Sequence, residues 1–158
     1  MAIDKVREYL KQFGRENDIL EFEVSSATVL LAAKALNCEP ERIAKTLSFK
    51  VEDRCVLIVT AGDVKIDNAK YKKEFSTKAK MLGYEEVRDL VGHSVGGVCP
   101  FGVKENVDIY LDTSLKRFDT VFPACGSSNS AIEITIPQLE EYSRYKAWID
   151  VCKLINEV

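Results

Sequence analysis

A glycine-rich stretch in the second half of the chain has the residue types and spacing that most favour chemistry. It runs Gly92-His93-Ser94-Val95-Gly96-Gly97-Val98-Cys99-Pro100-Phe101-Gly102. Four glycines and a proline in eleven residues predict an irregular backbone path. Such a path can direct successive N–H groups at one point, which suits a carbonyl oxygen or a phosphate. A connecting loop whose glycines only make turns is the competing interpretation, and the glycine count does not decide between them.

A second stretch of small residues covers positions 124–130. It reads Ala124-Cys125-Gly126-Ser127-Ser128-Asn129-Ser130 and lies between two expected strands. Its hydroxyls and N–H groups could face the same pocket as the glycine-rich loop. A polar connection between strands is the simpler interpretation of this segment when it is taken alone.

Three further side chains are candidates for chemistry. Lys45, followed by Thr46, lies where a short helix is expected to pass into a strand; a solvated lysine or a helix C-cap is commoner there than catalysis. His93 and Cys99 are six residues apart in a bent loop, which permits a Cys–His nucleophile. No third group that would orient the histidine can be identified.

Composition limits the class of protein. The 158 residues are 46% hydrophobic and 30% charged, which predicts one globular domain over residues 1–158. His93 is the only histidine, and five separated cysteines without a CxxC pair argue against a structural zinc or a disulfide framework. We therefore expect no metal, no cofactor and reduced cytoplasmic thiols. The first ten residues do not resemble a signal peptide, and no apolar run is long enough to span a membrane.

The elements that must position these residues follow from hydrophobic periodicity. Helices are predicted over 4–13, 27–36, 68–75, 84–90 and 138–145, with shorter helical turns at 40–44 and 114–117. Strands are predicted over 19–24, 47–51, 55–59, 107–111, 120–122 and 132–136, and we favour a strand for 147–151 as well. This mixture indicates a single α/β domain with a mixed sheet and peripheral helices. It lacks the pattern of a doubly wound nucleotide-binding fold and the GKS/T ending of a phosphate-binding loop.

The segment from 65 to 80 is locally basic in a chain whose net charge is −3. Six lysines face one aspartate and one glutamate there, with two aromatic residues between them. A basic helix of this kind can bind phosphates through charge alone, although a solvated lysine-rich helix fits equally well. The lysines are Lys65, Lys70, Lys72, Lys73, Lys78 and Lys80.

Four features, taken in order along nearly the whole chain, resemble the YbaK/ProX family of aminoacyl-tRNA deacylases. They are Ala44-Lys45-Thr46-Leu47 entering a hairpin, Gly96-Gly97-Val98-Cys99-Pro100-Phe101-Gly102, a strand over 107–112, and Gly126 before Ile132-Glu133-Ile134. The resemblance implies an α+β fold on a mixed, barrel-like sheet surrounded by helices. It also implies a free-standing trans-editing hydrolase that cleaves the ester between a wrong amino acid and the 3′ end of tRNA, typically tRNA for proline carrying a small or thiol amino acid. The implied partners are the aminoacyl-tRNA 3′ end and, as a candidate, prolyl-tRNA synthetase.

The same resemblance assigns roles to individual residues. Lys45 matches the essential lysine of the family and is the implied catalytic residue, as a charge anchor rather than a nucleophile. Thr46, the glycine loop with Gly96, Gly97 and Val98, and Gly126 match the pocket for the terminal adenosine and the aminoacyl group.

The chain also departs from the family pattern around this pocket. Some members have a hydroxyl residue where Ala124-Cys125 stand, and Ser127-Ser128 replace a basic, glycine-containing version. His93 approaches the glycine loop and could line the pocket. These differences bear on which amino acid is removed.

Two hypotheses from other classes stay open at this point. One is a non-catalytic module that binds a tRNA end or a synthetase without hydrolysis. The other is a hydrolase or thiol enzyme that depends on Cys99. The physical argument for editing is that an aminoacyl ester is already activated, and that a synthetic site discriminates small side chains by only about 1–3 kcal/mol per methylene.

Overall fold

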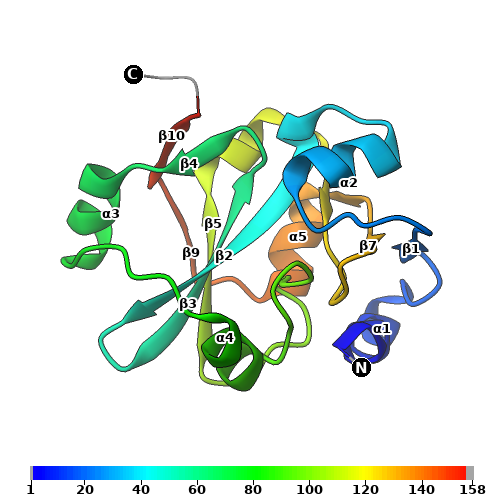
Figure 1. Ribbon diagram of the computed structural model, residues 1–158, viewed down its shortest axis with the longest axis horizontal. Coiled ribbons are helices and arrows are strands. Elements are labelled where there is room, and N and C mark those ends of the chain that lie inside the picture. The colour runs from blue at the N-terminus through cyan, green and yellow to red at the C-terminus, as the bar shows by residue number, and fades with distance from the viewer. Residues whose placement is uncertain (1, 156–158) are drawn as a thin grey trace.

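A six-stranded mixed sheet forms the centre of the computed structural model, which describes residues 2–155. The strand order is β8-β6-β2-β3-β5-β9, and the sheet curls into a half-barrel (Figure 1). Its strands are β2 (Ile43–Val51), β3 (Arg54–Ala61), β5 (Val107–Asp112), β6 (Thr120–Pro123), β8 (Ile134–Thr135) and β9 (Ala147–Ile149). β2 and β3 are an antiparallel hairpin, whereas β2–β6, β3–β5 and β5–β9 are parallel pairs.

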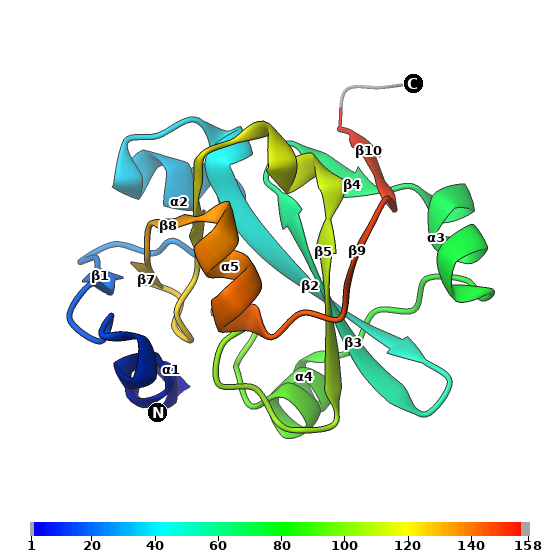
Figure 2. The same ribbon diagram turned by 180° about the vertical axis from the view of Figure 1, so that it is seen from behind.

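Two short ribbons and several helices surround this sheet. The ribbons pair β1 (Leu20–Glu21) with β7 (Ser130–Ala131) and β4 (Val64–Ile66) with β10 (Cys152–Leu154). The α-helices are α1 (Ala2–Leu10), α2 (Val29–Leu36), α3 (Asn68–Phe75), α4 (Tyr84–Val91) and α5 (Ile136–Ser143). Short 3₁₀ turns cover Lys11–Phe13, Pro40–Arg42 and Thr113–Arg117. α4 lies in front of the sheet in Figure 1, and Figure 2 shows α5 against the opposite face.

The core is built on β3, which is central in the sheet. Every residue of β3 after Arg54 is buried, and Leu57, Ile58 and Val59 are completely so. A strand covered on both faces is expected to have this near-continuous apolar run. Phe49 of β2 extends the core towards α3, where its ring packs against Tyr71 with centroids 5.1 Å apart.

The sequence predictions hold best for elements with strong end signals. α2, α3 and α5 begin after Thr28, Asp67 and Thr135, whose side chains accept hydrogen bonds from first-turn amides, as N-caps do. The predicted hairpin is confirmed and is longer than expected, and the final segment does contain a strand, β9. No helix in the described part of the chain has the length and apolarity needed to cross a membrane.

Three predicted elements need correction. The helix expected over 40–44 ends at Arg42, and β2 begins at Ile43 because that residue pairs with β6. The strand expected over 132–136 keeps only Ile134–Thr135, since Ile136 already starts α5 ahead of its proline. The strand expected over 19–24 is reduced to Leu20–Glu21. β4 and β10 were not predicted because three-residue strands carry too little periodicity.

Close backbone contact joins the two small-residue loops. The Gly97 carbonyl accepts a hydrogen bond of 3.0 Å from the Gly126 amide. A Cβ atom at Gly97 would lie 2.6 Å from the Ser127 nitrogen, and one at Gly126 would lie 2.8 Å from the Ala2 carbonyl oxygen. Gly97 is therefore required where the two loops meet, and Gly126 where its loop meets the start of α1, because no side chain fits at either contact.

His93 anchors the start of the glycine-rich loop from inside the protein. Its side chain is completely buried, and its Nε2 lies 2.9 Å from the Phe101 carbonyl oxygen. This bond closes the loop from residue 93 to residue 101. Burial lowers the pKa of the imidazole, and nearby Lys5 lowers it further, while the bond to Phe101 acts in the opposite direction.

We predict that Gly97→Ala destabilises the fold by about 1–3 kcal/mol, because the added methyl group must displace the backbone at Ser127. Thermal or denaturant unfolding measures this cost. Gly83→Ala is the matched control, since its Cβ would meet nothing closer than the Glu86 carboxylate at 3.7 Å. An equal cost for both variants would contradict the tight junction.

We predict that His93 makes the fold sensitive to acid. Between the lowered folded pKa and the unfolded value of about 6.5, the unfolded chain binds a proton that the folded chain does not, so stability falls as pH falls through this window. His93→Gln, which can still donate to Phe101, should reduce this dependence. Denaturant unfolding at a series of pH values from about 5 to 7.5 tests it, and identical pH slopes would refute the prediction.

Candidate functional site

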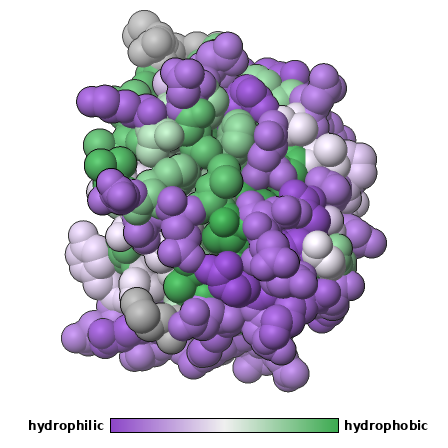
Figure 3. Space-filling model, turned by 90° about the vertical axis from the view of Figure 1, so that its right-hand side faces the viewer, coloured by the Kyte–Doolittle hydropathy of each residue, from purple (hydrophilic) through white to green (hydrophobic). Residues whose placement is uncertain are grey.

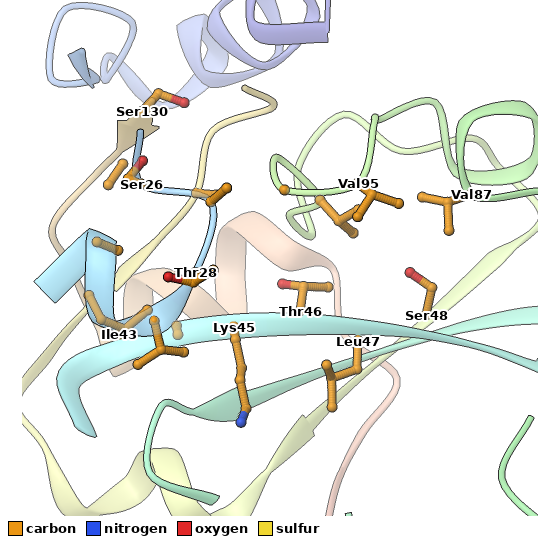
Figure 4. Close-up of a pocket in the computed structure, with 18 of the residues that line it drawn as sticks. Ser26, Thr28, Ile43, Lys45, Thr46, Leu47, Ser48, Val87, Val95 and Ser130 are labelled. Carbon is orange, nitrogen blue, oxygen red and sulfur yellow. The ribbon is translucent and has the colours of Figure 1, made fainter. Parts of the chain in front are cut away.

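A cavity of about 500 Å³ opens above β2 (Figure 4). Its floor is the first half of β2, and its walls come from the N-terminal end of α2, from α4 and from the glycine-rich loop. The lining includes Ser26, Thr28, Val29, Ala32, Ile43, Ala44, Thr46, Ser48, Leu82, Tyr84, Val87, Val95, Gly96, Val98, Phe122, Ala124 and Ser130. Most of these groups are small or apolar, and the polar ones are hydroxyls.

The alternation of side chains along β2 decides what faces the cavity. Thr46 and Ser48 project into it, whereas Lys45 and Leu47 project from the other face of the strand (Figure 4). Successive residues of a strand must point to opposite faces. β2 is held in this orientation by its full antiparallel register with β3, in which Thr46 is opposite Val59.

Thr46 has a hydroxyl that is free to bind a ligand. Its Oγ1 is buried and makes no hydrogen bond within the described residues. A buried hydroxyl without a partner costs about 1–3 kcal/mol. A ligand in the cavity that hydrogen-bonds to Thr46 would recover this cost.

The Lys45 ammonium lies on the opposite side of β2. It donates a hydrogen bond to the Val64 carbonyl oxygen of β4. Burial lowers the pKa of this ammonium, and Asp63 and Cys152 partly oppose that effect. Lys45 is the only charged residue among the described residues that line the cavity, and its ammonium points away from the cavity (Figure 4), so none of the described lining residues places a charge inside it.

The glycine-rich loop contributes only part of itself to the cavity. Gly96 and Val98 line it, with Gly96 at φ +94°, where a side chain would be strained. Gly97 and Gly126 instead make the backbone junction behind the wall. The two small-residue stretches meet at this junction, and of the second stretch Ala124 and Ser130 line the cavity.

The two serines after Gly126 brace the loop rather than line the cavity. The Ser127 hydroxyl donates to Asn129 Oδ1 at 2.9 Å, and its oxygen lies 2.7 Å from the Ser130 hydroxyl, which can donate to it. The Ser128 carbonyl accepts from the Ser26 amide at 2.6 Å. Through these bonds the loop fixes Ser26 and Ser130, which are themselves part of the lining.

His93 and Cys99 touch, as their spacing permits, but they form no nucleophile. The Cys99 sulfur lies 3.6 Å from His93 Nε2, both side chains are completely buried, and neither lines the cavity. Burial raises the pKa of the Cys99 thiol to about 12. The thiol is therefore protonated and inaccessible, which argues against a Cys99-dependent reaction.

Several lining residues were missed from the sequence. Ser48 could have been found, because it shares a strand face with Thr46 at a spacing of two. Tyr84 and Val87 of α4 gave no local signal, since only the tertiary fold brings α4 over β2.

The wall of the cavity that α2 forms continues onto an exposed hydrophobic surface (Figure 3), where the side chains of Leu30 and Leu31 are 73% and 43% exposed.

Known proteins with similar sequences or folds agree with this architecture. YwhH of Bacillus subtilis (strain 168), itself uncharacterized, is 56% identical over 154 residues, which are 97% of this chain and 98% of YwhH. The proline–tRNA ligase of Geobacillus sp. (strain WCH70) is 34% identical over 102 residues, 64% of this chain but only 18% of the ligase. The crystal structure of a candidate trans-editing enzyme for prolyl-tRNA synthetase matches with a TM-score of 0.86 at 26% identity, covering 96% of this chain and 97% of that one.

The family model for the aminoacyl-tRNA editing domain matches residues 23–142. This range contains most of the cavity lining, including all of α2, β2 and α4. The chain therefore belongs to the aminoacyl-tRNA editing domain family.

Proposed function

We propose that this protein hydrolyses the ester bond of mischarged aminoacyl-tRNA, acting in trans on tRNA for proline that carries a small or thiol amino acid. The observation that carries this proposal is the cavity above Thr46, whose buried hydroxyl has no hydrogen-bond partner among residues 2–155, in a chain of the editing family. The similarity to a proline–tRNA ligase supports the choice of tRNA. The match over 97% of a candidate trans-editing chain supports action in trans.

The cavity lining supports a small substrate side chain. Ala27, Ala32, Ala44 and Ala124 leave space close to β2, while Ile43 and Phe122 limit it. We propose that the aminoacyl group lies between these walls, where Ile43 and Phe122 would restrict the size of its side chain.

The chemistry required of the protein is modest. Water adds to the ester carbonyl carbon, the bond from that carbon to the ribose oxygen breaks, and the ribose oxygen leaves with a proton. Because the ester is already activated, positioning and stabilisation of the oxyanion are sufficient. Gly96 and Val98 line the cavity, and their amides donate to no group of residues 2–155, so these two amides are our candidate donors to that oxygen. Thr46 would hold the substrate beside them.

Lys45 would act as a positioning residue in this scheme. Its bond to the Val64 carbonyl ties β2 to β4 and thereby fixes the neighbouring Thr46. The resemblance to the family implies that Lys45 is essential. Its bond to Val64 gives a physical reason for this role that does not require the ammonium to lie in the cavity.

The first experiment is deacylation of a panel of mischarged tRNAs. Wild type should release the amino acid, and Thr46→Val should lower kcat/KM by about tenfold, the effect of losing one hydrogen bond, without loss of stability. Thr60→Val is the matched control, because Thr60 is buried and donates to Ala61 outside the cavity. No release by wild type from any member of the panel would refute the function.

A second prediction distinguishes a positioning role of Lys45 from direct contact between its ammonium and the substrate. Lys45→Ala should lower kcat by about tenfold or more with little change in KM, whereas Lys45→Arg, which can still donate to Val64, should recover much of the loss. Full activity of Lys45→Ala would contradict any role. A loss in both variants, with a change in pH profile, would instead indicate that the ammonium itself contacts the substrate.

A non-catalytic module remains the second candidate, and one observation favours it. No described histidine, aspartate, glutamate or cysteine lines the cavity, so the described lining lacks the side chains that act most often as general acids or bases. Tight binding of aminoacyl-tRNA with no turnover would select this candidate. Cys99→Ala should keep the wild-type rate of release if the protein is a hydrolase, and the wild-type affinity for aminoacyl-tRNA if it is a binding module.

A further inference from the structure

Residues 80–82 run antiparallel beside β2 and extend the cavity floor. The Lys50 amide donates to the Lys80 carbonyl at 2.8 Å, and the Leu82 amide donates to the Ser48 carbonyl at 3.1 Å. Phe49 and Met81 form the bridge between these two bonds. This register sets Ser48 opposite Leu82, both of which line the cavity, and sets Lys50 opposite Lys80 just beyond it.

The two lysines share the face of β2 that carries the cavity. Lys50 lies two residues from Ser48 and four from Thr46, so all three project to one side. A residue directly opposite in an antiparallel pair lies on the same face, which adds Lys80. Four residues of strand span about 13 Å, so the lysines lie at the mouth of the cavity rather than inside it.

Nothing in residues 2–155 neutralises this pair. Both side chains are exposed, and neither makes an ion pair. Lys70 of the same basic segment differs, since it binds Asp150 and the Cys152 carbonyl. Glu86 on the facing helix already accepts from the Gly83 amide at the start of α4. Like charges directly opposite destabilise a sheet, and a bound anion would remove that cost.

An exposed aromatic residue follows Lys80 by four positions. Tyr84 is the first residue of α4, lines the cavity and is 78% exposed. Exposed aromatic rings next to basic groups are typical of proteins that bind single-stranded nucleic acid, because every base can stack on them.

We propose that Lys50 and Lys80 bind phosphates of the single-stranded tRNA 3′ end, and that Tyr84 stacks on one of its bases, upstream of the aminoacylated adenosine. The inference rests on the proposed function and specifies the path by which the tRNA leaves the cavity. It also selects one lysine of the basic segment 65–80 for phosphate binding. Among the lysines of that segment, only Lys80 lies opposite a lysine of β2.

Two substrates test the proposal. One is mischarged tRNA, and the other is 3′-aminoacyl-adenosine, which lacks the upstream phosphates. The double variant Lys50→Ala/Lys80→Ala should raise KM for the tRNA about tenfold and reduce the slope of log KM against log salt by about 1.4, for two phosphate contacts on a single strand. Hydrolysis of 3′-aminoacyl-adenosine should not change. Lys72→Ala/Lys73→Ala, on exposed positions of α3, removes the same charge and should leave both substrates unaffected.

Tyr84 is tested separately. Tyr84→Ala should raise KM for the tRNA about fivefold or more, whereas Tyr84→Phe should keep the wild-type value, since stacking does not need the hydroxyl. An equal increase in KM in the two variants would contradict stacking.

The outcomes are distinguishable. If wild type hydrolyses neither substrate, the proposed function fails. If wild type hydrolyses both and the lysine double variant keeps the wild-type KM and salt slope, the proposed path is overturned. If the lysine double variant loses activity equally on both substrates, the proposed path is also overturned, because the lysines would then act on the cavity or the fold.

Discussion

The alternation of side chains along β2 is the constraint on which the rest of the structure depends. One strand places Thr46 in the cavity and Lys45 on the reverse side, and the register with β3 prevents either from changing face. The same alternation carries Lys50 to the mouth of the cavity. A shift of β2 by one residue would exchange these faces, removing the hydroxyls from the cavity and the lysine from its mouth.

The cavity wall depends on a second constraint, the close approach of two loops. Gly97 and Gly126 allow backbones to meet where no Cβ atom fits, and the buried His93 holds the first loop closed through Phe101. Residues behind the wall therefore matter for the site without touching a ligand. Of the described glycine-rich stretch, Val95, Gly96 and Val98 reach the lining, so the other residues of the stretch act on the cavity through the backbone path.

Much of this architecture could be predicted from the sequence, and the physical reasons differ between elements. Capped helices such as α3, which begins after Asp67, and the alternating hairpin carry their signals locally. The start of β2 at Ile43 does not, because it depends on pairing with β6. Periodicity likewise cannot show that α4 covers the cavity with Tyr84, or that Lys80 lies opposite Lys50. Lys45 is the clearest example. The family resemblance pointed to this residue, but the direction of its side chain follows only from the register of β2.

A crystal structure of the protein with a non-hydrolysable analogue of 3′-aminoacyl-adenosine would locate the substrate relative to β2. We predict that the aminoacyl group lies above β2, with a polar atom within hydrogen-bond distance of Thr46 Oγ1, while Lys45 stays bound to Val64. An analogue bound on the reverse side of β2, in contact with the Lys45 ammonium and away from Thr46, would contradict it.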